Sequence, residues 1–221
     1  MIVLDIETSG MSISRSGVWQ IAALDLISKD EFIDEARLDE NDEITDEALE
    51  ITGKTEEELR DENKQSQKEL IQKFFYWLRN KKEKNFICQN PQFDIAWVSF
   101  RCEKYGIKKE YPYRAFDLHT IAQLKHSQIH GSFLLKEIKG EIKSDMNLPN
   151  ILKFCGIPDE RMYIRDGKVI QEGKPHDALE DCKLEGECFS RLVYGRNLFQ
   201  EFKKFPVPNY LKQNDDGVNK K

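Results

Sequence analysis

The sequence has no hydrophobic run long enough to cross a membrane and no paired cysteines. Its apolar stretches stay well short of the roughly 18–20 residues that a spanning helix needs. The chain opens MIVLDIET, without the basic and apolar regions of a secretory signal. The five cysteines form no CxxC pair. We therefore expect a cytoplasmic protein that does not bind membranes and whose cysteines are reduced and packed.

Charge is distributed unevenly along the 221 residues. The formal net charge is −6, and 39% of the residues are hydrophobic, which excludes collagen-like and wholly disordered chains. Residues 30–69 contain 17 acids and five bases. We interpret this block as a solvated helical face. The rest of the chain is net positive, so a local basic surface for nucleic acid remains compatible with the acidic total.

Patterns typical of strands and helices alternate and predict an α/β domain with a mixed sheet. Strands are expected at 1–6, 18–27, 31–38, 85–88 and 114–117. The short connections between the first three predict antiparallel neighbours. Helices are expected at 46–51, 65–80, 91–105, 118–125, 148–155 and 177–194.

Two stretches fit this alternation less well, residues 127–147 and 161–171. In the second, strand-like residues flank an Asp166-Gly167 pair, which is typical of a hairpin turn. We therefore expect one domain over residues 1–205, with a hairpin insertion near 161–172, and a flexible tail over 206–221. The hairpin is either a decorative loop or one wall of a substrate groove.

Four carboxylates stand where apolar residues are expected. Asp5 and Glu7 end the most apolar strand and point to one face of it. Asp94 and Asp181 lie on the apolar stripes of their helices. Each alone has a structural explanation, a strand end that reaches solvent or an acid that caps a neighbouring element. Together they would repel one another unless cations bound between them.

Oxygen ligands without sulfur or paired imidazoles select Mg²⁺ or Mn²⁺. Two such ions about 3.5–4 Å apart can stabilise the attacking and leaving oxygens at a phosphorus. His176 precedes Asp181 by five residues, just ahead of the helix. This position on a loop suits a general base that accepts a proton from water.

Three motifs in this order carry a resemblance to a known family. They read DIETSG at 5–10, NPQFD at 90–94 and HDALED at 176–181. The chain resembles the DEDDh family of 3′–5′ exonucleases, the DnaQ-like group with polymerase proofreading subunits, RNase T and oligoribonuclease. The tyrosine branch of this group would place a tyrosine at 177, where this sequence has Asp177.

The resemblance implies an RNase H-like mixed sheet, with three antiparallel and two parallel strands flanked by helices. It implies that two Mg²⁺ or Mn²⁺ ions are bound by four acids and that His176 is the general base. The implied ligands are Asp5, Glu7, Asp94 and Asp181. The implied reaction releases nucleoside 5′-monophosphates from the 3′ end of single-stranded DNA or RNA. The implied substrate contacts are Thr8, Ser9, Gly10, Met11, Asn90 and Phe93.

Other interpretations stay open at this point. A binding module that kept the fold and lost catalysis is the first alternative, although the acid set and His176 are intact. An endonuclease of the same fold is the second. Gln89 stands where many family members have histidine, which leaves the substrate undecided. The sequence does not choose between DNA and RNA, nor decide whether the chain forms a homodimer or associates with a polymerase.

Three weaker patterns have structural explanations that we prefer. His126 and His130 have a spacing that can hold zinc but lack further ligands nearby. The aromatic run at 74–77 suits a helix core better than a stacking platform. The basic cluster at 79–84 is either a solvated helix end or a contact to a nucleic-acid backbone.

Overall fold

The computed structural model describes residues 1–165 and 168–213, which form two compact units. Unit 1 comprises residues 1–116 and 160–183, and unit 2 comprises residues 117–159 and 184 onward. The strand β5 (Ala115–Asp117) and the helix α7 (Ala178–Tyr194) each run from one unit into the other. No described helix is long and apolar enough to span a bilayer.

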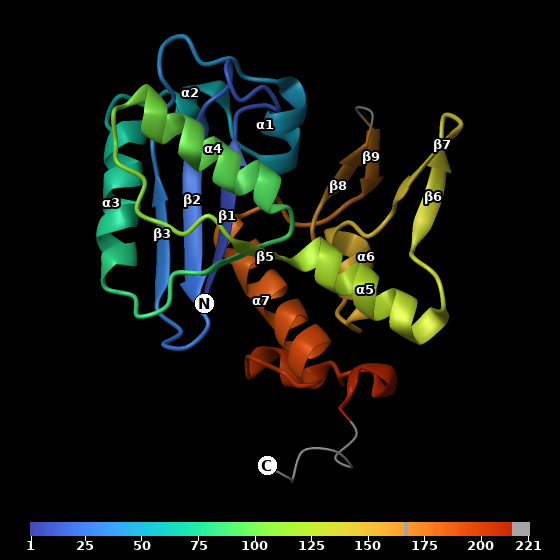
Figure 1. Ribbon diagram of the computed structural model, residues 1–221. Coiled ribbons are helices and arrows are strands. Elements are labelled where there is room, and N and C mark those ends of the chain that lie inside the picture. Colours follow the sequence, from blue (N-terminus) through green and yellow to red (C-terminus); the bar gives the residue numbers. More distant parts are fainter. Residues whose placement is uncertain (166–167, 214–221) are drawn as a thin grey trace. The chain divides into compact units, whose positions relative to one another are not determined.

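Unit 1 contains the central sheet and the helices beside it (Figure 1). Its elements are β1 (Ile2–Thr8), β2 (Val18–Asp25), β3 (Glu31–Glu35), α1 (Asp46–Thr52), α2 (Glu56–Leu59), α3 (Gln67–Arg79), β4 (Phe86–Cys88), α4 (Pro91–Lys104), most of β5, the hairpin strands β8 (Tyr163–Arg165) and β9 (Lys168–Gln171), and the start of α7.

The sheet has five strands in the order β3-β2-β1-β4-β5. β1 pairs antiparallel with β2 and parallel with β4, and β2 pairs antiparallel with β3. The mixed sheet flanked by helices confirms the predicted fold class. A bulge interrupts the β1–β2 register between Glu7 and Thr8, and a bulge beside a strand end re-aims the neighbouring side chains.

One face of the sheet forms the main core. The alternate residues Ile2, Leu4 and Ile6 of β1 pack into one buried cluster with residues of α3 and α4. Phe74 and Phe75 of α3 are buried in it, so the aromatic run at 74–77 is core packing, as we expected. Because strand side chains alternate, Asp5 and Glu7 face the other side.

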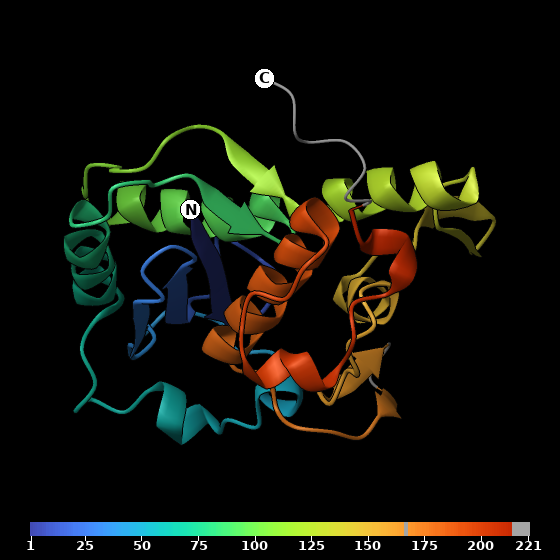
Figure 2. The same ribbon diagram turned by 90° about the horizontal axis from the view of Figure 1, so that it is seen from below.

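The start of α7 lies on that other side of the sheet, opposite α4, as Figure 2 shows. Two contacts attach it to β2. The Gln20 Oε1 atom accepts a hydrogen bond from the Ala178 N–H at 3.0 Å. The Cys182 thiol lies 3.5 Å from the carbonyl oxygen of Ala22. These contacts bring the first turn of α7 over the face that carries Asp5 and Glu7.

Unit 2 contains α5 (Leu118–His130), the hairpin β6 (Leu135–Ile138) and β7 (Glu141–Ser144), α6 (Leu148–Phe154), the rest of α7 and two 3₁₀ turns, η1 (Glu201–Lys204) and η2 (Asn209–Leu211). The helix α5 is longer than expected and ends at Gly131 in a left-handed conformation. The β6–β7 hairpin was not predicted. Its turn residues Lys139 and Gly140 both have positive φ, the geometry of tight hairpin turns.

A buried ion pair organises the C-terminal part of unit 2. Arg191 and Glu187 are both 0% exposed, and the Arg191 Nε atom lies 2.8 Å from a Glu187 carboxylate oxygen. The other Arg191 nitrogens donate to the carbonyl oxygens of Cys155, Phe202 and Phe205. The second Glu187 oxygen accepts the backbone N–H groups of residues 198 and 199. This network fixes the chain after α7.

The part of the predicted tail that the structure describes is packed. Val207 and Leu211 are 8% and 1% exposed, and the Tyr210 hydroxyl donates to the carbonyl oxygen of Phe154 at 2.8 Å. Residues 214–221 and the Asp166-Gly167 turn lie outside the described residues. The strands β8 and β9, before and after residues 166–167, pair antiparallel.

All five cysteines are buried in the fold. Burial raises the pKa of the Cys102 thiol to about 11 and the pKa of Cys188 well above its usual range. The expectation that the cysteines are packed is therefore confirmed.

Candidate active site

Glu7 comes from the last residues of β1, on the face that the core does not use. The pKa of its carboxyl is raised to about 8, first by burial and then by the nearby charges of Asp181, Asp177 and Asp94. Arg161 acts in the opposite direction and lowers this pKa. A buried carboxyl with three acidic neighbours is a position where negative charge exceeds positive charge.

Asp94 lies in the first turn of α4, which begins with Pro91. Only 5% of Asp94 is exposed. Burial raises the pKa of its carboxyl to about 7, while hydrogen bonds from the backbone N–H groups of Asp94 and Ile6 lower it. The bond from Ile6 places this carboxylate against β1, one residue from Glu7. The inward direction predicted from the helical stripe is therefore confirmed.

Asp181 lies in the first turn of α7, which Asp177 precedes. The Asp177 Oδ1 atom accepts the backbone N–H groups of Leu179 and Glu180, both at 3.1 Å, and so caps the helix. Asp181 is 5% exposed, as its position on the apolar stripe predicted. The contacts of α7 with β2 hold it over the face of Glu7.

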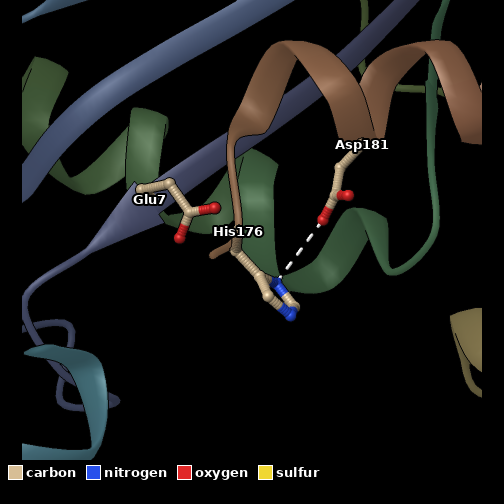
Figure 3. Close-up of side chains that lie close together, drawn as sticks. All are labelled: Glu7, His176 and Asp181. Atoms are coloured by element: carbon tan, nitrogen blue, oxygen red, sulfur yellow. Dashed lines mark ion pairs between the residues drawn. The ribbon is translucent and has the colours of Figure 1, made fainter. Parts of the chain in front are cut away.

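Figure 3 shows how Glu7, His176 and Asp181 converge from three segments of unit 1. One ligand atom from each lies within 4.8 Å of the other two, a spacing that could hold a metal ion. Asp5 and Asp94 do not belong to this close group. Asp5 shares a strand face with Glu7, and Asp94 acts on Glu7 electrostatically. The structure therefore brings the predicted site residues to one region, in which Glu7, His176 and Asp181 form the close group.

His176 is held by its own loop and by α1. Its backbone N–H donates to the carbonyl oxygen of Ile51 at 3.0 Å. Its ring Nε2 lies 2.9 Å from the carbonyl oxygen of Met162, and its Nδ1 lies 3.6 Å from Asp181 Oδ2. Pro175 packs beside Gly53, where an added Cβ would approach the proline ring to 3.2 Å. Gly53, in a left-handed conformation, ends α1.

Arg161 adds a cation that the sequence did not point to. Its Nη1 atom lies 3.0 Å from Asp181 Oδ2, the oxygen that also faces His176. The two side chains are 10% and 7% exposed. Nothing in the local sequence pattern indicates that the Arg161 side chain turns inward.

The predicted substrate contacts differ in their accessibility. Ser9 is buried, and its hydroxyl donates to the carbonyl oxygen of Glu43 and accepts the Gly17 N–H. It is thus a structural residue of the loop. Gly10 has no room for a Cβ, which would lie 2.7 Å from the Ser16 hydroxyl. Met11 is 78% exposed.

Two further predicted contacts lie at the start of α4. Asn90 is exposed and occupies the N-cap position, but its side chain makes no capping hydrogen bond. The ring of Phe93 is partly buried and lies 5.7 Å from that of Trp97. Asn90 therefore has a side chain that the helix does not use.

The weaker candidates have structural roles. The rings of His126 and His130 lie 4.5 Å apart and pack against Phe154, and no described group of three metal ligands includes them. In the basic cluster, Arg79 pairs with Glu110 and Lys81 with Asp30. These pairings agree with the interpretation as a helix end.

The donor set fits hard divalent cations. It consists of carboxylate oxygens and one imidazole, with no thiolate, which matches the preference of Mg²⁺ and Mn²⁺. Burial raises the pKa of both Glu7 and Asp94, and the charges of neighbouring acids raise that of Glu7 further. Negative charge around Glu7 is therefore not balanced within the cluster. A cation would relieve that imbalance.

Comparison with known proteins agrees with this geometry. A model of the RNase T family, described as exonuclease, matches residues 2–189. No curated protein matches the sequence. Several solved structures do, all at low sequence identity.

The nuclease domain of 3′hExo, a DEDDh family member solved bound to rAMP, is 13% identical with a TM-score of 0.61, and the match covers 94% of this chain and 95% of that one. Cell-death related nuclease 4 is 16% identical, with a TM-score of 0.62 and coverage of 87% and 62%. Exonuclease I of E. coli, in complex with an oligonucleotide, is 16% identical, with a TM-score of 0.61 and coverage of 92% and 42%.

This chain thus spans less than two thirds of two of these proteins. At such identities the structural likeness shows the fold, the RNase H-like fold of DEDDh exonucleases. The family match extends over most of the sequence, from β1 into α7, and includes all three motifs. The chain therefore belongs to the RNase T family of exonucleases.

Proposed function

We propose that this protein is a metal-dependent 3′–5′ exonuclease that releases nucleoside 5′-monophosphates from single-stranded nucleic acid. One observation carries the proposal. Glu7, His176 and Asp181 converge within 4.8 Å, and burial and neighbouring acids raise the pKa of Glu7 to about 8. Such a cluster is costly for a fold to maintain without a cation.

Asp5, Glu7, Asp94 and Asp181 would hold the cations. Two divalent ions bound there would orient the attacking water and stabilise the charge that develops on the phosphate oxygens. The chain's own contribution is to fix the ligands. β1 presents two of them from one strand face, and the first turns of α4 and α7 present one each.

His176 would accept the proton of the attacking water. A carbonyl oxygen only accepts hydrogen bonds, so the contact with Met162 places the proton of the neutral ring on Nε2. The Nδ1 lone pair is then directed toward the carboxylate side, 3.6 Å from Asp181 Oδ2. A water bound beside Nδ1 would meet a base that is already in the correct tautomer.

The 3′-terminal nucleotide would contact the loop after β1 and the start of α4. Met11 is the exposed apolar side chain of this loop, and Asn90 offers an amide that α4 leaves unused. We propose Thr8, Gly10, Met11, Asn90 and Phe93 as contacts.

The test uses matched 5′-labelled single-stranded DNA and RNA, from dinucleotide to about 30-mer. We expect stepwise shortening from the 3′ end with Mg²⁺ or Mn²⁺ and release of 5′-monophosphates. An Asp181→Asn variant is the inactive control. Full activity in excess EDTA would contradict metal dependence, and cleavage of circular single strands would identify an endonuclease. Binding without cleavage under all conditions would identify a binding module.

A further inference from the structure

Arg161 places a positive charge inside the carboxylate cluster. Its Nη1 atom lies 3.0 Å from Asp181 Oδ2, and both side chains are largely buried. At this distance the contact is a charge-assisted hydrogen bond. Arg161 also lowers the pKa of Glu7, so its charge acts on more than one acid of the cluster.

The backbone holds Arg161 in this position. Residue 161 forms a parallel bridge with residue 174 at the base of the β8–β9 hairpin. The Met162 N–H donates to the carbonyl oxygen of Lys174 at 2.7 Å, and the Lys174 N–H donates to that of Glu160 at 2.9 Å. The Gln171 side chain donates to the Arg161 carbonyl oxygen at 3.0 Å.

Gly173 allows the segments around residues 161 and 174 to lie close together. A Cβ at Gly173 would lie 2.5 Å from the backbone carbon of Arg161 and the carbonyl oxygen of Glu160, which no side chain tolerates. The stem therefore depends on glycine at this position, and it holds the backbone from which the guanidinium reaches Asp181.

We propose that Arg161 is an internal counter-ion that competes with the catalytic cation for Asp181. This inference rests on the proposed function. Asp181 Oδ2 faces both Arg161 and His176, and Asp181 belongs to the group of residues that could bind a metal ion. A cation that binds Asp181 beside this contact would compete with the guanidinium for the same negative charge, because the two cations repel each other. In the protein without metal, Arg161 offsets part of the repulsion among the acids.

Competition lowers the affinity of the nucleic-acid-free protein for metal. A guanidinium that leaves Asp181 becomes available to an anion, and the backbone phosphate of a substrate is an anion that arginine binds well. The metal ion would release the guanidinium from Asp181, and the phosphate would then bind the released guanidinium. Binding of metal and of nucleic acid would therefore favour each other.

The test measures Mn²⁺ binding by calorimetry and by electron paramagnetic resonance, without nucleic acid. Hydrogen bonds to charged groups are worth about 1.5–3 kcal/mol, so Arg161→Gln should bind Mn²⁺ about tenfold to a hundredfold more tightly than the wild type. Arg161→Lys, which keeps the charge but not the planar fork, should lie between them. Lys174→Gln is the matched control, because Lys174 lies on the same stem and pairs with the exposed Glu160. Its Mn²⁺ affinity should equal that of the wild type.

Equal or weaker binding by Arg161→Gln would overturn the proposal. If that variant does not fold, the wild type supplies the measurement. Its Arg161 Nε–H signal in nitrogen-15 NMR should shift on addition of Mg²⁺. The Arg161→Lys variant, which lacks this signal, assigns it. An unchanged signal at saturating Mg²⁺ would also overturn the proposal. Absence of Mn²⁺ binding to the wild type would instead contradict the proposed function.

Discussion

Glu187 and Glu7 are both carboxylates held away from solvent, but their surroundings differ. Both Glu187 oxygens are occupied, one by Arg191 and the other by two backbone N–H groups. Around Glu7, acids outnumber bases, and its pKa rises to about 8. A buried charge that is fully paired serves the fold. One that is surrounded by like charge indicates a site that is completed from outside the chain.

Removal of one negative charge from the cluster around Glu7 should have the largest effect. We expect Asp181→Asn to lower turnover on a single-stranded oligonucleotide by about 10³-fold or more, because metal-bound charge stabilisation is worth several kcal/mol. Circular dichroism should show an intact fold. Glu180→Gln, on the same helix turn but exposed, is the matched control and should keep wild-type turnover. An Asp181→Asn enzyme with normal turnover would remove this residue from the mechanism.

His176 tests the catalytic side of the cluster separately from metal binding. We expect His176→Ala to lower turnover by about 10²–10⁴-fold, the usual contribution of general-base catalysis. Mn²⁺ affinity should change much less than turnover. His119→Ala serves as a control, since His119 bonds to Ser144 in unit 2. Normal turnover of His176→Ala would exclude it as the base.

The buried Glu187–Arg191 pair should behave in the opposite way, because its loss should affect stability. Arg191→Met should lower the free energy of unfolding by about 3–5 kcal/mol, because Glu187 is left buried and unpaired. Replacing both residues, Glu187→Leu with Arg191→Met, should recover part of that loss. Urea denaturation of the full chain measures both. A single variant as stable as the wild type would mean that the pair contributes nothing to the fold.

Stability should also depend on pH in opposite senses for paired and unpaired acids. Glu7 and Asp94 have ordinary pKa values of 4.5 and 3.8 that rise to about 8 and about 7 in the fold. Their contribution is therefore complete below about pH 4 and is lost as the pH rises toward 8. Glu35 and Asp39, whose pKa values are lowered by lysine partners, stabilise the fold above pH 5 instead.

In EDTA we expect the melting temperature to fall by about 5 °C between pH 5.5 and pH 8.5. Saturating Mg²⁺ should abolish most of this fall, and Glu7→Gln should flatten it. Differential scanning calorimetry in both conditions provides the measurement. A melting temperature that rises over this range in EDTA would show that the cluster is not the dominant titrating site.

The smallest effect is expected from the β8–β9 hairpin. Replacing residues 163–171 by a short Gly-Ser linker retains Arg161 and Lys174. We expect the KM for oligonucleotides to rise by about threefold to tenfold, more for long substrates than for short ones, if the hairpin contacts the substrate. Wild-type efficiency at all lengths would identify the hairpin as decoration.

Much of unit 1 could be predicted from the sequence, because its signals are local. The apolar run of β1, the Pro91 start of α4 and the Gly53 end of α1 each fix one element boundary. The inward direction of Asp94 and Asp181 followed from helical periodicity alone. Their approach to Glu7 depends on how the sheet and helices are arranged. Only the resemblance to a known family, based on its three motifs, predicted that arrangement.

Other features could not be read from the chain. The pairing of Arg161 with Asp181 requires the hairpin stem to return the chain at residue 174, and no periodic pattern encodes that return. The β6–β7 hairpin was missed because a Lys139-Gly140 turn is a weak signal beside asparagine- or aspartate-glycine pairs. The Glu187–Arg191 pair has helical spacing, but its burial depends on segments far along the chain.

The burial of all five cysteines has a practical consequence for labelling chemistry. Maleimides react with thiolates, and burial with a raised pKa keeps native thiols such as Cys102 in the unreactive form. A Met11→Cys substitution would introduce a thiol where the native side chain is 78% exposed. A single fluorophore could then be attached without removing any native cysteine, and its emission would report the arrival of an oligonucleotide end at the loop after β1.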